Sequence, residues 1–380
     1  MLVSSMSSSV AAGTDFAAAG GGWTQDGYGP GNTGYQPDAG PLAVDRLRLR
    51  WSVTPGTGVE GCTTTPGPPL VADGRVFFFD SGGVGAYDAR TGHSLWRATG
   101  FSLLGPGLAV AGGLVLVTAS SCFSQSDFES TITALDARTG RPRWTAREAG
   151  TVDFLVADQG VLVTHGYCGV CGDSQNEIVA FRTSDGTRLW SRTDALLAGP
   201  VSAAGRVILT VANRSLAVDV RTGATIWTSK IAWWARSATP AGDYFYASNA
   251  NDLAAVDAGT GRVAWSIPNG AGEIAADGRR VFVAATGVTA YDARSGRRLW
   301  QRAVPDAGRP VRAAGLLWVT AGGRPMAILA PPTGRTIASG KRFNTAAGHV
   351  AVAAGHLFTT DGTTIRAYDD LDSDGLPRAA

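Results

Sequence analysis

Residues 86–96, AYDARTGHSLW, return almost letter for letter as AYDARSGRRLW at residues 290–300. The shared pattern is A-x-D-x-x-T-G-x-x-x-W, and further copies occupy the chain between these two. The copies end at Trp96, Trp144, Trp190, Trp227, Trp265 and Trp300, and a degenerate one, ILAPPTGRTIA, ends at Ala338. Their ends lie 35 to 48 residues apart. Short apolar runs and turns at such a period indicate a radial or stacked β repeat.

Each part of the pattern has a structural reason. Apolar runs such as VFFFD before the Asp are typical of strands. The Asp side chain can accept hydrogen bonds from backbone N–H groups two residues on, and the Gly adopts a positive φ that closes a hairpin. The Trp then lies on the returning strand, where it is suited to packing between neighbouring sheets. The pattern predicts units of four strands, A to D, with the Asp ending C and the Trp on D.

The two ends of the chain supply the halves of one more unit. LRLRWSV at residues 47–53 resembles a D strand without a preceding C strand, and TIRAYDD at 364–370 a C strand without a D strand. Paired in one sheet, they bring the count to eight units and close a ring. We therefore predict an all-β, eight-bladed β-propeller of four-stranded antiparallel blades, with its edges short or covered.

The repeat resembles that of the pyrroloquinoline quinone (PQQ) propellers, the quinoprotein alcohol dehydrogenase-like family. The preamble WTQDGYGPGNTGYQPDAGPL at residues 23–42 also resembles the lead-in before such propellers. The resemblance implies either a dehydrogenase that uses PQQ and calcium or a non-catalytic propeller, such as the outer-membrane assembly lipoprotein. The dehydrogenases carry two adjacent cysteines above the quinone, and this sequence has no Cys-Cys pair. The non-catalytic members are therefore the nearer match.

Composition and charge exclude several classes of protein. Charged residues make up 17% of the 380 residues and apolar residues 44%, which favours a packed core over global disorder. The net charge of +2 gives no basic field for nucleic acid. No run of 18 apolar residues occurs, so no transmembrane helix is expected.

The predicted domain organisation is simple. Residues 23–376 form one propeller domain, residues 1–22 a disordered segment or the remainder of a signal or linker, and residues 377–380 a tail. The N-terminus has no basic region followed by a continuous apolar one, so an intact signal peptide is not predicted. The cysteines nevertheless favour an extracytoplasmic location, secreted or in the cell envelope.

Four cysteines lie in three long loops at residues 54–67, 119–130 and 165–177. They are Cys62, Cys122, Cys168 and Cys171. Such a cluster predicts two disulfides in an oxidising compartment, and of the three possible pairings we favour Cys62–Cys122 with Cys168–Cys171. The alternative is a zinc site, although zinc ribbons usually offer two C-x-x-C knuckles and this chain has one. Free thiols are the remaining possibility.

Further candidates for a site lie in these loops, in the connection after Trp227 and just before inner strands, on the face that the resemblance implies holds the quinone in the dehydrogenases. His165 and Asp153 are the candidate proton carriers of an enzyme without cofactor. Ligand-binding candidates are Trp233, Trp234, Tyr167, Phe123 and Glu273. Aromatic side chains could stack on a planar ligand or simply line the blades, and the acids could bind a cation or be solvated.

DLDSDG at residues 370–375 matches the opening of a calcium loop, with Asp370, Asp372 and Asp374 as oxygen ligands. The twelfth-position Glu of such a loop has no counterpart in this sequence, so a solvated acidic tail is the competing interpretation. The function we predict is an extracytoplasmic propeller that binds a protein partner or small ligand on its loop-rich face, as a monomer and without bound PQQ. The alternatives are a PQQ- and calcium-dependent alcohol or sugar dehydrogenase and a cofactor-free biosynthetic enzyme.

Overall fold

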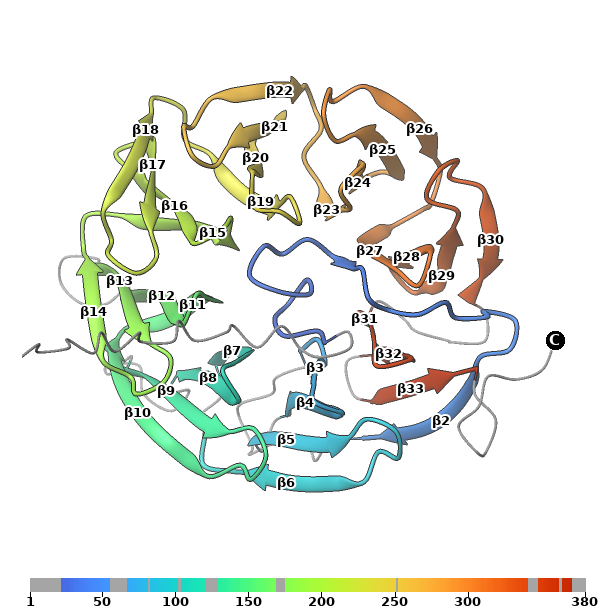
Figure 1. Cartoon of the computed structure of the whole chain (residues 1–380), viewed down its shortest axis with the longest axis horizontal. Coiled ribbons are helices and arrows are strands. Elements are labelled where there is room, and N and C mark those ends of the chain that lie inside the picture. The colour runs from blue at the N-terminus through green and yellow to red at the C-terminus, as the bar shows by residue number, and fades with distance from the viewer. Residues whose placement is uncertain are drawn as a thin grey trace, which may run out of the picture.

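The computed structural model describes residues 22–54, 67–80, 83–101, 104–120, 129–168, 175–250, 252–340, 348–361 and 364–370. Within these ranges the regular elements are strands, and no helix is long and apolar enough to cross a membrane. Eight sheets surround a common centre (Figure 1). In seven of them the strands follow the order of the chain from the centre outward, whereas the outer strand of the eighth comes from the N-terminal part of the chain. The predicted eight-bladed β-propeller is confirmed.

Four blades come from the first half of the ring. Blade 1 comprises β3 (Leu70–Ala72), β4 (Arg75–Asp80), β5 (Gly83–Asp88) and β6 (Ser94–Ala98). Blade 2 comprises β7 (Leu104–Ala111), β8 (Leu114–Ser120), β9 (Glu129–Asp136) and β10 (Pro142–Ala149). Blade 3 comprises β11 (Thr151–Asp158), β12 (Val161–Cys168), β13 (Gln175–Arg182) and β14 (Arg188–Arg192). Blade 4 comprises β15 (Leu196–Ser202), β16 (Arg206–Val211), β17 (Arg214–Asp219) and β18 (Thr225–Ser229).

The second half of the ring includes the blade that joins both ends of the chain. Blade 5 comprises β19 (Trp234–Ala238), β20 (Tyr244–Asn249), β21 (Asp252–Asp257) and β22 (Val263–Ile267). Blade 6 comprises β23 (Glu273–Ala276), β24 (Arg280–Ala284), β25 (Val288–Asp292) and β26 (Arg298–Arg302). Blade 7 comprises β27 (Ala307–Ala313), β28 (Leu316–Ala321), β29 (Arg324–Leu329) and β30 (Thr336–Ser339), with β1 (Tyr35–Gln36) added parallel to β27. Blade 8 comprises β31 (Val350–Ala353), β32 (His356–Thr360), β33 (Ile365–Asp369) and, as its outer strand, β2 (Arg48–Val53).

The repeated Trp and Gly join each blade to the next. Trp227 lies on β18, the outer strand of blade 4. Its Nε1 donates a hydrogen bond to the carbonyl oxygen of Ala258 in blade 5, at 2.9 Å. Gly261 closes the turn beside it with φ of +72°, and a Cβ there would lie 2.7 Å from the Trp227 ring. Equivalent hydrogen bonds start from Trp51, Trp96, Trp144, Trp190, Trp265 and Trp300. The repeat is therefore a contact between blades as well as a hairpin signal.

Residues 22–36, here called the plug, lie inside the ring (Figure 1). The plug hydrogen-bonds to seven successive inner strands, through backbone atoms in six of them and through the Gln25 side chain in blade 3. Each contact lies near the C-terminal end of the inner strand. The inner-strand residues contacted are Val71, Val110, Ala157, Ser202, Ala238, Ala276 and Arg312. Gln36 then donates from Nε2 to the carbonyl of Gly22 at 2.7 Å, which joins the two ends of the plug. We call this end of the ring the plugged end and the opposite end the open end.

A tight turn in the plug depends on glycine. Gly27 has φ of +74°, and a Cβ on it would lie 1.8 Å from Oδ1 of Asn32. The Asn32 side chain cannot move aside, because its Nδ2 donates to the carbonyl of Arg236 in blade 5. Asn32 Oδ1 also accepts from Arg309 in blade 7 at 3.0 Å. This turn holds the neighbouring Asp26 at the centre of the ring.

Candidate functional site

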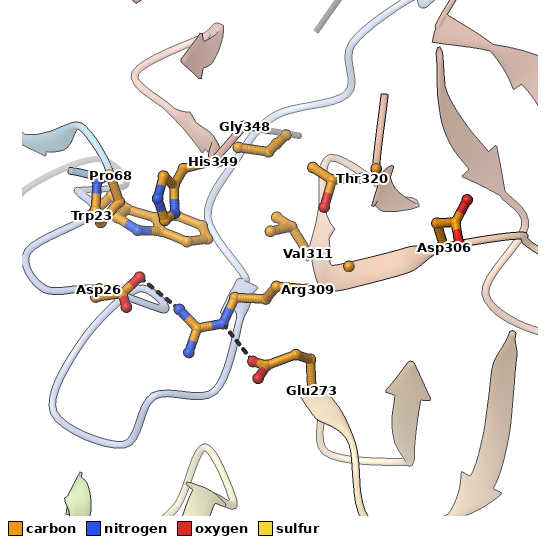
Figure 2. Close-up of a pocket in the computed structure, with 13 residues that line it drawn as sticks. Trp23, Asp26, Pro68, Glu273, Asp306, Arg309, Val311, Thr320, Gly348 and His349 are labelled. Atoms are coloured by element: carbon orange, nitrogen blue, oxygen red, sulfur yellow. Dashed lines mark hydrogen bonds and ion pairs between the residues drawn. The ribbon is translucent and has the colours of Figure 1, made fainter. Parts of the chain in front are cut away.

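The plug and blades 6 to 8 enclose a cavity of about 510 Å³, which we call the acidic cavity. Trp23 and Asp26 of the plug form part of its lining, together with Glu273, Asp306 and Arg309 from the inner strands of blades 6 and 7 and the segments before them. Val311 and His349 are further lining residues (Figure 2). Because Glu273 begins β23 and Asp306 precedes β27, the cavity extends from the plug toward the open end.

Arg309 lies between two carboxylates in this cavity (Figure 2). Its Nη1 is 2.5 Å from Oδ1 of Asp26, and its Nε is 3.5 Å from Oε2 of Glu273. Both acidic side chains are more than half exposed, at 57% and 51%, whereas Arg309 is 25% exposed. The guanidinium therefore ties the plug to blades 6 and 7, and each carboxylate has a second oxygen that these contacts do not use.

The remaining charges of the cavity leave it with a negative balance. Asp306 lies 3.4 Å from Nε of Arg324, so this acid has its own cation. Desolvation lowers the pKa of His349, partly opposed by the negative charge of Asp26, so the imidazole is neutral at pH 7. Asp26 and Glu273 then face Arg309 alone, which gives the lining one net negative charge.

The acidic cavity does not match the needs of a bound quinone. PQQ carries three carboxylates and, in the dehydrogenases that the repeat resembles, binds next to calcium. The cavity offers one guanidinium, Arg309, whose nitrogens already face Asp26, Glu273 and Asn32. Within the described ranges, no group of three or more His, Cys, Asp or Glu side chains could hold a metal ion. A trianionic ligand would meet more carboxylates than cations here, so these residues do not fit PQQ.

A second group of candidates lies at the open end of blades 3 to 5. Trp234 begins β19 and is 37% exposed, and its ring meets that of Phe154 edge-on, with centroids 5.6 Å apart. Phe154 in turn lies parallel to His165, its partner across β11 and β12. Tyr167 near the end of β12 is 43% exposed. We call Phe154, Tyr167 and Trp234 the aromatic patch.

His165 and Asp153 are placed near each other but not as a proton-transfer pair. The His165 ring is buried, and neither of its nitrogens has a hydrogen-bond partner at normal distance and angle among the residues the structure describes. Burial lowers the pKa of His165, and the negative charge of Asp153 together with the nearby Asn176 side chain partly opposes this effect. Asp153 itself is exposed on β11. The arrangement holds His165 neutral within the protein rather than directed at an accessible substrate.

The other predicted residues have varied positions. Trp233 is buried between blades 4 and 5, so of the two adjacent tryptophans Trp234 alone is available to a ligand. Asp370 accepts a hydrogen bond from the backbone of Ala43 at 2.8 Å, a contact within the blade-8 region. Six predicted residues lie outside the described ranges, namely Cys62, Cys122, Phe123, Cys171, Asp372 and Asp374. Cys168 ends β12, and its side chain is likewise outside the description.

Of the cavity residues, sequence reasoning identified Glu273 and missed Asp26 and Arg309. Asp26 lies in the preamble at residues 23–42, which resembles the lead-in before such propellers but gave no reason to assign this carboxylate a role. Arg309 lies in the connection before the seventh blade's apolar run, outside the repeated motif. Aligning the first residues of all inner strands would have placed Glu273 and Arg309 on adjacent blades at the same end of the ring.

The fold, the repeat and the plug together define a PQQ-repeat propeller. The family model described as outer membrane protein assembly factor BamB matches residues 42–267, 212–303 and 284–375. The chain belongs to this family. A comparison with curated protein sequences found no match.

Solved structures share the fold at low sequence identity. BamB from Moraxella catarrhalis has a TM-score of 0.61 and 18% identity, over 85% of this chain and 99% of that one. The quinohemoprotein alcohol dehydrogenase ADHIIG from Pseudomonas putida HK5 has a TM-score of 0.64 and 12% identity, over 95% and 81%. The corresponding enzyme from Comamonas testosteroni has a TM-score of 0.63 and 13% identity, over 94% and 82%. At these sequence identities the similarities show a shared fold.

Proposed function

We propose that this chain is an extracytoplasmic propeller that binds a protein partner at its open end, in the assembly of outer membrane proteins. The family supports the setting, and the aromatic patch carries the proposal. Trp234 and Tyr167 expose large apolar surfaces on a rigid sheet framework, and aromatic side chains of this kind dominate the energetics of protein interfaces. The contact of Trp234 with Phe154 fixes the indole before a partner arrives, which lowers the entropy cost of binding.

The test is a binding measurement with the partner that is crosslinked from the cell envelope by a photoreactive residue placed at position 167. Trp234→Ala should weaken that complex by about 30-fold, since truncation of a central interface aromatic costs about 2 kcal/mol. The control is Val263→Ala, which removes an exposed apolar side chain from the outer strand of blade 5. Unchanged affinity in Trp234→Ala, or an equal loss in Val263→Ala, would reject the aromatic patch as the binding face.

A further inference from the structure

The acidic cavity combines acceptors and a donor that the fold leaves unused. Asp26 and Glu273 each contact Arg309 through one oxygen, and their second oxygens make no hydrogen bond or ion pair among the described residues. Trp23 is 1% exposed, lines the cavity beside His349, and has no hydrogen-bond partner for its indole Nε1–H among the described residues (Figure 2). A buried donor without a partner destabilises the protein, so a ligand acceptor there would be favoured.

The size and lining of the cavity limit what that ligand is. A volume of about 510 Å³ is within the range of small-ligand sites, roughly 300 to 1,000 Å³. Val311, Val350 and Pro68 supply an apolar wall, and Asp26 and Glu273 supply the two carboxylates. A ligand that fills it needs an aliphatic stem, one positive charge and a hydrogen-bond acceptor. These are the features of an arginine or lysine residue within a peptide, whose stem packs on apolar surface while its head pairs with carboxylates.

We propose that the acidic cavity binds one basic side chain of a peptide, with its cationic head at Asp26 and Glu273 and a peptide carbonyl accepting from Trp23. This inference rests on the proposed function, since it assigns the segment of the partner that enters the open end. The net negative charge of the lining selects a cation over a neutral side chain, and the apolar wall selects arginine or lysine over a metal ion.

The experiment uses the full chain and fluorescently labelled pentapeptides of the form acetyl-Ala-Ala-X-Ala-Ala-amide, followed by anisotropy. X is arginine, its neutral isostere citrulline, or glutamate. The arginine peptide should bind about tenfold more tightly than the citrulline peptide, as expected for a hydrogen bond to a charged group. The glutamate peptide should bind more weakly than citrulline. Equal binding of arginine and citrulline would overturn the assignment.

Variants separate the parts of the site. Glu273→Gln should remove most of the preference for arginine over citrulline, whereas Trp23→Phe should weaken both peptides by a similar factor. The control is Asp252→Asn, an exposed carboxylate near the open end of blade 5 that does not line the cavity. A full preference for arginine in Glu273→Gln, with its melting temperature unchanged, would contradict the proposal.

The outcome also distinguishes this inference from the proposed function. If all three peptides fail to bind at millimolar concentration while Trp234→Ala still weakens the crosslinked partner, the cavity assignment fails and the binding face stands. If the arginine preference holds while Trp234→Ala leaves the partner unaffected, the cavity assignment stands and the aromatic patch is excluded.

Discussion

Arg50 on β2, the outer strand of blade 8, and Asp369 on the adjacent strand β33 form an ion pair, with Nε 2.6 Å from Oδ1. The Asp369 side chain is 3% exposed, and its other oxygen lies 3.4 Å from Nε2 of His356. The pair joins residues 319 positions apart in sequence. It therefore secures the seam at which the N-terminal and C-terminal strands complete the propeller.

Removing the acid from this seam should destabilise the whole ring. Asp369→Ala leaves Arg50 without its short contact inside a mostly buried setting, and breaking such a pair costs about 3 kcal/mol. Urea unfolding followed by tryptophan fluorescence measures the change. The control is Asp194→Ala, because Asp194 pairs with Arg192 but is itself 59% exposed, so its loss should cost under about 1 kcal/mol. Similar losses of unfolding free energy in the two variants would show that the Arg50–Asp369 pair contributes no more to stability than an exposed pair.

The contact between Trp227 and Gly261 should appear in a double-mutant cycle. Gly261→Ala places a Cβ 2.7 Å from the indole and strains a positive φ, whereas Gly315→Ala imposes a positive φ with open space around it. We expect Gly261→Ala to cost more than Gly315→Ala, by about 1 to 3 kcal/mol of overpacking. In the Trp227→Ala background this extra cost should disappear, because the ring is gone. A constant cost of Gly261→Ala in both backgrounds would mean that backbone strain alone is responsible.

Glu148 should make stability fall as the pH rises. This carboxyl on β10 is buried, and burial, reinforced by the charge of Glu177, raises its pKa to about 8 from 4.5. Below pH 4.5 the group is protonated in both the folded and unfolded chain and costs nothing. Between about pH 4.5 and 8 the unfolded chain has released its proton and the folded chain has not. The free energy of unfolding therefore decreases, with a limiting slope of about 1.4 kcal/mol per pH unit from this group.

The pH effect is measured from urea unfolding between pH 5 and 8. Glu148→Gln should flatten the slope in that window and raise stability most at pH 8, because the amide has no charge to bury. Asp243→Asn is the control, an exposed carboxylate in the turn after β19. A slope that survives in Glu148→Gln would assign the pH dependence to other groups.

The mismatch between the acidic cavity and PQQ predicts no thermal stabilisation by PQQ with calcium. A cofactor at a hundred times its dissociation constant would stabilise the fold by about 2.7 kcal/mol, which is readily detected as a shift in Tm. Calcium alone is the parallel measurement, since a shift there would indicate an ion site independent of the quinone. A Tm rise that requires both components would contradict the cavity analysis and return a dehydrogenase to consideration.

The cysteine prediction is tested by counting thiols. With Cys62 paired to Cys122 and Cys168 to Cys171, the unfolded but unreduced protein should react with no equivalents of a thiol reagent, and the reduced protein with four. Peptide mapping without reduction then identifies the partners. Four reactive thiols before reduction would exclude the disulfides and weaken the extracytoplasmic location with them.

The features that could be predicted from the sequence are those that recur with the repeat. The Asp and Trp of each unit recur in sequence because each blade makes the same contact with the next, so blade number and strand order followed from spacing alone. Asp88, for example, ends β5 and accepts from the backbone of Thr91, as the turn chemistry requires. The closing blade followed from two half-units at the ends of the chain.

The site was harder to predict because its parts obey no period. The plug binds the inner strands through backbone N–H and C=O groups, which every residue carries and no sequence pattern marks. Arg309 and Asp26 meet through a turn built on Gly27 and Asn32, a relationship between segments almost 300 residues apart. The aromatic patch was partly predicted, since Trp234 and Tyr167 lie at strand ends next to connections that the repeat makes recognisable.

The plug has a consequence for the order in which the chain can fold. Its residues are synthesised before the strands of the blades, yet their hydrogen-bonding partners extend as far as Arg312. The outer strand of blade 8 likewise cannot pair until β33 has been synthesised. Contacts of such long sequence separation carry a large loop-closure entropy and slow the folding of β proteins. Individual blades can form earlier from local hairpins. The N-terminal segment should therefore gain its protection from hydrogen exchange last, when the ring closes around it.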